Sequence, residues 1–135
     1  MRAVLGFISG AISVLVFHQG AWALLYLAGL MPPPYPTVPI PPWGVPQIVD
    51  FCFWGGLYGA AYGLAALKLP MPAWVAGLLL GVIASLVFWF VVLPLKEEPA
   101  AGGWGWQSMV VVLAIQAAWG MGVGLILALL RAHAR

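Results

Sequence analysis

Long runs of apolar residues alternate with short polar segments along the chain. A helix needs about 20 predominantly apolar residues to cross the hydrocarbon core of a bilayer. Four runs reach this length, at about residues 4–30, 48–67, 74–92 and 109–130. The pattern therefore predicts an all-α integral membrane protein, with residues 1–135 forming a single four-helix bundle of transmembrane helices.

The first run has two interpretations. Its apolar start and the tripeptide Ala21-Trp22-Ala23 are typical of a secretory signal peptide and its cleavage site. The apolar run continues as far as Leu30, however. We therefore expect a retained, long and tilted helix.

Prolines separate the first two predicted helices. Most of the 12 prolines lie between Pro32 and Pro46. Proline lacks a backbone N–H and has a fixed φ, so this segment is expected to form neither helix nor ladder strand but a stiff, polyproline-like chain. We expect residues 31–47 to be an external loop. The stretch 69–72 predicts a tight turn, and 94–107 a polar loop containing glycine.

Composition narrows the class of protein further. Apolar residues make up 64% of the chain and charged residues only 6%, whereas a soluble domain carries about 25% charged residues. A soluble domain of this size has too little interior to bury so much apolar surface. Soluble domains, disordered tails and nucleic-acid binders are excluded, and membrane lipids are the expected surroundings.

The lysines and arginines predict an orientation. If both termini are cytoplasmic, Arg2, Lys68, Arg131 and Arg135 lie inside and Lys96 alone lies outside. Loops rich in lysine and arginine stay in the cytoplasm. We therefore expect a multi-pass protein with its N- and C-termini both inside.

An internal repeat links the two halves of the chain. A shift of 71 residues lays Gly6–Phe17 over Gly77–Phe88, with six of 12 positions identical. A weaker match lays the segment from Trp54 over that from Trp119. Helix 1 thus resembles helix 3 and helix 2 resembles helix 4, which predicts two parallel helical-hairpin repeats.

Glycines recur at a spacing of four within each predicted helix. This spacing places small residues on one stripe, a glycine zipper, where two helix backbones can approach closely. Packing is the simpler interpretation, and a pore lining or a lipid-tail groove is the alternative. The candidate packing residues are Gly6, Gly10, Gly55, Gly59, Gly63, Gly77, Gly81, Gly120 and Gly124.

Polar residues within the predicted spans are candidate functional groups, because they are costly at membrane depth. The helix rise of 1.5 Å per residue places His18, Gln19, Asp50 and Gln116 in the outer half, where they could share one outward-facing zone. A His18–Asp50 pair would make a proton- or cation-responsive site. Each residue also has a structural interpretation: Asp50 complements a helix start, and His18 and Gln116 hydrogen-bond between helices.

Aromatic residues suggest a second candidate site. Trp22, Tyr26, Tyr58 and Tyr62 could line an apolar crevice for a lipid or quinone. The single cysteine, Cys52, excludes an intrachain disulfide and a cysteine-rich zinc site. No metal-ligand cluster or nucleophile motif stands out, so we expect no enzyme, no metal and no cofactor.

Three stretches of sequence resemble known membrane proteins. VFHQGAWALLYLAG and PPPYPTVPIPPWGVPQIVDFCFWGG resemble small inner-membrane proteins of proteobacteria, and LKLPMPAWVAGLLLGVIASLVFWFVVLPL is similar to part of the YagU-like inner-membrane family. The resemblance implies a bacterial inner-membrane location. It implies no set of catalytic residues.

Three classes of function remain open. The first is a non-enzymatic scaffold or accessory subunit, as a homo-oligomer or within a larger membrane complex. The second is a small transporter or channel that uses the outward-facing zone at His18 and Asp50. The third is a lipid- or quinone-binding subunit that uses the aromatic crevice.

Overall fold

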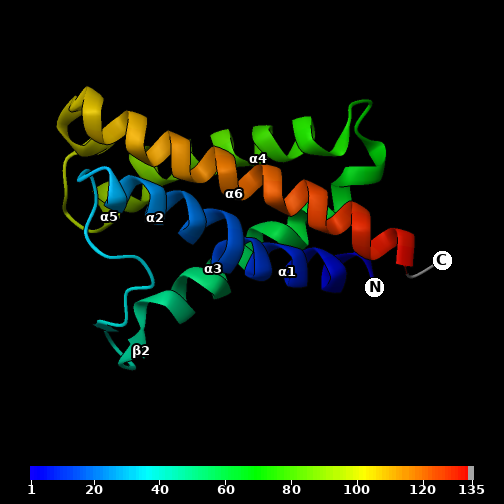
Figure 1. Ribbon diagram of the computed structural model, residues 1–135, viewed down its shortest axis with the longest axis horizontal. Coiled ribbons are helices and arrows are strands. Elements are labelled where there is room, and N and C mark those ends of the chain that lie inside the picture. Colours follow the sequence, from blue (N-terminus) through cyan, green and yellow to red (C-terminus); the bar gives the residue numbers. More distant parts are fainter. Residues whose placement is uncertain (134–135) are drawn as a thin grey trace.

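The computed structural model describes residues 1–133, and most of them are helical (Figure 1). Within this range three helical segments are long and apolar enough to cross a membrane: Arg2–Leu27, Ala73–Leu95 and Trp106–His133. The prediction of a helical protein with membrane-compatible helices is thereby confirmed. Arg135, one of the predicted inner charges, lies outside the described residues.

Two of these segments contain a wider π-helical turn. The first consists of α1 (Arg2–Ser13), the π segment η1 (Val14–His18) and α2 (Gln19–Leu27). The second consists of α4 (Ala73–Val87), the π segment η3 (Phe88–Val92) and α5 (Leu93–Leu95). A π turn inserts one extra residue, so the side chains beyond it are rotated relative to those before it.

The returning helices are α3 (Gln47–Ala65), which continues into the short 3-10 turn η2 (Ala66–Lys68), and α6 (Trp106–His133). α3 contains Gln47 and Asp50 near its start, and it is not among the three membrane-compatible segments. A second 3-10 turn, η4 (Ala100–Trp104), precedes α6.

The proline-rich segment forms a small antiparallel ladder. Strand β1 (Pro39–Ile40) pairs with β2 (Val45–Pro46), and Pro39 lies opposite Pro46. The expectation that this segment forms no ladder strand is therefore wrong. Prolines are tolerated at such a short edge ladder, because other residues supply the donors: the Gly44 N–H bonds the Ile40 carbonyl at 2.9 Å and the Gln47 N–H bonds that of Val38 at 3.0 Å.

The long helices pack side by side in the order α3, α1, α6, α4 (Figure 1). The start of α1 and the end of α6 lie at one end of the bundle, which we call the terminal end. The proline-rich segment and the connection that holds η4 lie at the opposite end, which we call the loop end. The path of the chain therefore consists of two helical hairpins that start at the terminal end.

Backbone contacts between glycines hold the first hairpin together. A Cβ atom on Gly59 would collide with the Gly6 carbonyl, and one on Gly63 with the Arg2 carbonyl. A Cβ atom on Gly10 would collide with the Gly55 carbonyl. The α1 and α3 backbones thus touch along three successive turns, which larger residues would prevent.

The second hairpin has the same pattern of contacts between α4 and α6. Gly120 faces the Gly77 carbonyl, Gly124 faces the Ala73 carbonyl, and Gly81 faces the Gln116 carbonyl. The α4 partners lie 71 residues after their α1 counterparts. The α6 partners, however, lie one helical turn away from the positions that the Trp54–Trp119 match suggests. All nine candidate packing glycines lie at one of these two contacts or next to one.

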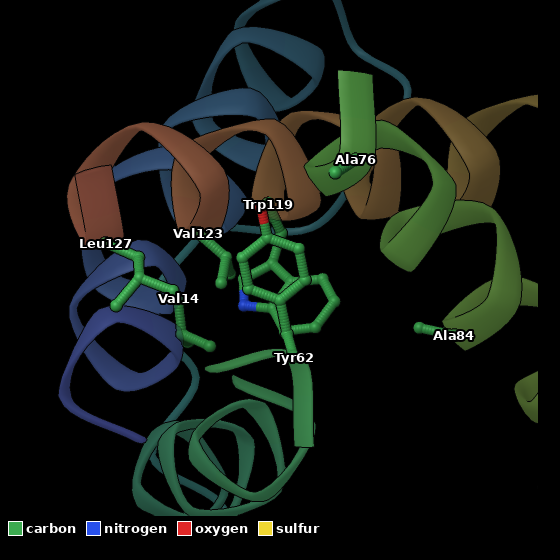
Figure 2. Close-up of a cluster of buried hydrophobic side chains, with 7 residues drawn as sticks. All are labelled: Val14, Tyr62, Ala76, Ala84, Trp119, Val123 and Leu127. Carbon is green, nitrogen blue, oxygen red and sulfur yellow. The ribbon is translucent and has the colours of Figure 1, made fainter. Parts of the chain in front are cut away.

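The core lies where the hairpins meet, around Trp119 and Tyr62 (Figure 2). Trp119 is 2% exposed. Its indole N–H donates to the Gly10 carbonyl at 3.1 Å, and its own carbonyl accepts the Ser13 hydroxyl at 2.6 Å. Trp119 therefore joins α6 to α1 by two hydrogen bonds in opposite directions.

Candidate functional site

A polar cluster lies at the loop end of the first helical segment. The Gln19 side chain, which is 0% exposed, has its amide nitrogen 2.9 Å from Nδ1 of His18. Its amide oxygen accepts the backbone N–H of Tyr35 at 2.5 Å. Since that N–H can only donate, the amide NH₂ must face His18, and Nδ1 accepts. His18 is thus held as a neutral ring with its proton on Nε2.

Tyr35 ties the proline-rich segment to the π segment η1. Its hydroxyl donates to the Leu15 carbonyl at 2.7 Å, while its backbone N–H binds Gln19. The wider turn of a π segment changes which carbonyls bond within the helix, and Leu15 lies inside that turn. One residue of the loop therefore satisfies a buried side chain and a backbone group of the helix together.

Aromatic rings close the cluster on its other sides. The His18 ring lies with its centroid 5.4 Å from that of Phe51 and 6.1 Å from that of Trp22. The Trp22 indole N–H donates to the Pro32 carbonyl at 2.7 Å. Trp22 thus fastens the start of the proline-rich segment, and the rings surround His18 with apolar surface.

Asp50 does not join this cluster. It lies in the first turn of α3, half-buried, and makes no capping hydrogen bond with its side chain. No ion pair joins it to His18, whose neighbour from α3 is the adjacent Phe51. The His18–Asp50 pair expected from sequence is therefore not formed.

Gln116 lies in a different contact. Its backbone carbonyl meets Gly81 between α4 and α6, at the place that Gly55 occupies in the first hairpin. Its side chain is half-buried and forms no hydrogen bond with the described residues. The four polar candidates thus divide into a His18–Gln19 pair, a helix-start carboxylate and a helix-packing residue.

The four aromatic candidates do not line one crevice either. Trp22 belongs to the His18 cluster, and Tyr26 is exposed. Tyr58 lies edge-on to Trp119, with ring centroids 5.9 Å apart. The Tyr62 hydroxyl donates to the Ala73 carbonyl at 3.2 Å, which joins the end of α3 to the start of α4.

Sequence reasoning missed a cavity at the terminal end. It has a volume of about 180 Å³ and lies between α3, α4 and α6. Arg131 and Tyr62 border it, together with small and apolar residues. The Arg131 guanidinium donates to the Gly63 carbonyl at 2.9 Å. The sequence offered only one signal, a cation in the last turn of the last helix.

A shallow apolar groove of about 250 Å³ runs along the outer face of α3, lined by Trp54, Leu57, Tyr58 and Ala61. It contains no charged side chain. Across residues 1–133, no group of three His, Cys, Asp or Glu side chains is placed to hold a metal ion.

Comparison of this chain with protein-family models, with curated proteins and with solved structures finds no match. The resemblance to the YagU-like family stays a prediction. Evidence about function therefore comes from the geometry of the polar cluster and the cavity.

Proposed function

We propose that this chain is a multi-pass, non-enzymatic membrane protein that acts as a scaffold or accessory subunit. In this proposal all four long helices cross the inner membrane of a bacterium, as two duplicated hairpins. α3 is included because it spans 19 residues and packs against α1 along its glycines. The terminal end, with Arg2, Lys68 and Arg131, faces the cytoplasm, as expected for loops that carry positive charge.

This proposal rests on the hydrogen bonds of the buried polar side chains. The fully buried polar side chains are Ser9, Ser13, Gln19 and Ser85. Each bonds within the chain: Ser9 and Ser85 to carbonyls of their own helices, Ser13 to α6, and Gln19 to His18 and Tyr35. No buried side-chain polar atom of the described residues lacks a partner.

Because the buried polar side chains are already hydrogen-bonded within the chain, they favour a structural role over transport. A solute path across a bilayer needs polar groups that can exchange their partners for the solute. At the loop end such an exchange would break the bonds that hold the proline-rich segment. The segment is instead a fixed outer surface, fastened at Pro32 and Tyr35, with Trp43 85% exposed between the two strands. Tryptophan is enriched at membrane interfaces.

Flux measurement in proteoliposomes tests the proposal. Wild type, His18→Ala and Gln19→Leu are reconstituted at equal density, and proton and monovalent-cation fluxes are followed with internal dyes. We expect all three to match protein-free vesicles. A wild-type flux well above background that His18→Ala abolishes would support the transporter alternative and contradict the scaffold.

The mass of the particle in nanodiscs tests the association that a scaffold implies. We expect two or more copies, or a stable partner that co-purifies, because a scaffold or accessory subunit acts by binding other chains. A single monomeric mass both in nanodiscs and in mild detergent would contradict this part of the proposal.

A further inference from the structure

The cavity at the terminal end exists because small residues surround it. Ala66, Ala73, Gly124 and Ala128 contribute to its wall between α3, α4 and α6. Its volume of about 180 Å³ exceeds the engineered cavities of roughly 150 Å³ that bind benzene. There is therefore room for a compact chemical group without any movement of the helices.

Arg131 supplies the charge of this cavity. One of its N–H groups binds the Gly63 carbonyl, in the last turn of α3 where carbonyls lack partners within the helix. A guanidinium has five N–H donors, and this single anchor fixes its position while other donors remain. No carboxylate of the described residues forms an ion pair with it; Asp50, Glu97 and Glu98 all lie toward the loop end.

The rest of the lining suits an amphiphilic ligand. The Tyr62 hydroxyl lies beside Arg131, and Leu67, Met71 and Leu127 form an apolar wall. The lining thus combines one cationic side chain, Arg131, with apolar side chains.

The whole terminal end is positively charged. Among the described residues it holds Arg2, Lys68 and Arg131 and no acidic residue. In the membrane orientation proposed above, on which this inference rests, the cavity is a basic pocket between transmembrane helices on the cytoplasmic side, and such pockets bind the head groups of anionic lipids.

We propose that this cavity binds a phosphate-bearing anion, namely the head group of an anionic phospholipid. Arg131 takes two phosphate oxygens in a fork, since a guanidinium matches that geometry. The glycerol region lies against Leu67 and Met71, and the acyl chains pass outward into the bilayer. Free phosphate can also bind Arg131, but it makes no stabilising contact with Leu67 and Met71.

Native mass spectrometry of the full-length protein in mild detergent tests this proposal. Three probes are titrated: phosphatidylglycerol, phosphatidylcholine and inorganic phosphate. We expect one phosphatidylglycerol to bind more tightly than phosphatidylcholine, and inorganic phosphate to compete weakly. The loss of a charge-assisted contact in Arg131→Gln should weaken phosphatidylglycerol binding about tenfold.

Three further variants make the result specific. Arg131→Lys keeps the charge but loses the fork, so its binding should lie between wild type and Arg131→Gln. Ala128→Phe fills the exposed mouth of the cavity and keeps Arg131, so it should abolish phosphatidylglycerol binding. This variant still tests the cavity if Arg131→Gln fails to fold. Lys68→Gln removes a charge from the same end outside the cavity and should bind as wild type does.

Several outcomes would overturn the proposal. Equal phosphatidylglycerol binding by wild type and Ala128→Phe would place the lipid elsewhere. Equal binding of phosphatidylcholine and phosphatidylglycerol would remove the selectivity for anions. Inorganic phosphate that binds as tightly as the lipid would make the ligand a soluble anion. None of these outcomes depends on the flux or mass measurements that test the scaffold.

Discussion

At the loop end the buried Gln19 amide has both of its polar atoms bonded within the chain, whereas at the terminal end Arg131 donates one hydrogen bond and still borders a cavity. The loop end is closed by its own residues. The terminal end leaves charge and space for something outside the chain. A polar side chain in this bundle therefore indicates a ligand only where its hydrogen-bonding groups are not already bonded within the chain.

The difference arises from the lengths of the connections. The proline-rich segment between α2 and α3 is long enough to fold back, so Pro32 and Tyr35 reach Trp22 and Gln19. At the terminal end only residues 69–72 separate η2 from α4. That turn adds Met71 to the cavity wall, but it is too short to fold back over α3, α4 and α6 as the proline-rich segment does.

The largest loss of stability is expected in α3, because this helix contributes residues to both ends of the bundle. α3 carries Phe51 at the loop end and Gly63 at the terminal end, and Gly59 holds it against α1. In Gly59→Val the added Cβ would collide with the Gly6 carbonyl, so the helices must separate. We expect a loss of more than about 4 kcal/mol in the free energy of unfolding, measured by denaturation in detergent.

Gly20→Val is the matched control for this change. No atom lies within 4 Å of a Cβ placed on Gly20. We expect a change within about 0.5 kcal/mol. Equal losses for the two variants would contradict the claim that close backbone contact, rather than any glycine in a helix, holds the hairpin.

The second prediction concerns the loop end alone. Gln19→Leu leaves the Tyr35 N–H and the His18 ring without their partner, and a buried unsatisfied group costs about 1–3 kcal/mol. We expect a loss in that range and faster proteolysis between Pro32 and Pro46. Gln116→Leu, at a side chain without a hydrogen bond, should change neither quantity appreciably. Equal proteolysis in both variants would show that Gln19 does not fasten the segment.

A smaller effect is expected for Tyr35→Phe. It removes the bond from the hydroxyl to the Leu15 carbonyl but keeps the backbone bond to Gln19. One neutral hydrogen bond contributes about 1 kcal/mol. Hydrogen exchange of residues 32–46 should speed up in Tyr35→Phe and stay unchanged in Tyr26→Phe, whose ring is exposed. Unchanged hydrogen exchange in both variants would show that the Tyr35 hydroxyl does not hold the proline-rich segment in place.

The smallest effect is expected for Asp50→Asn. A carboxylate in the first turn of a helix contributes about 0.3–1 kcal/mol through the helix dipole, and His18 does not pair with it. The ¹⁵N chemical shifts of the His18 ring should therefore stay the same. A shift toward a different protonation state would restore the His18–Asp50 pair that the structure does not form.

Much of the fold is encoded in local sequence. Apolar runs locate the long helices, and glycines four residues apart locate the backbone contacts, since both depend on residues close together in the chain. The π turns are not visible in such patterns, and each one rotates the residues beyond it. His18, Gln19 and Trp22 therefore face directions that a regular count from Gly6 would not give.

The candidate site was less predictable, because it depends on residues far apart in sequence. The bond from Tyr35 to Gln19 requires the proline-rich segment to fold back on its own helix. The place of Gln116 beside Gly81 depends on a register one turn away from the one that the tryptophans suggest. The cavity at Arg131 is bordered by residues of three helices, and no spacing of residues along the chain encodes how those helices meet.

The difference between the two ends is tested most directly by melting Gln19→Leu and Arg131→Gln in parallel, with and without phosphatidylglycerol in a phosphatidylcholine background. We expect Gln19→Leu to melt at a lower temperature than wild type in both lipids but to keep the full stabilisation by phosphatidylglycerol. Arg131→Gln should lose most of that stabilisation. If Gln19→Leu lost the stabilisation by phosphatidylglycerol and Arg131→Gln kept it, the lipid would bind at the loop end, which would contradict the proposed difference between the two ends.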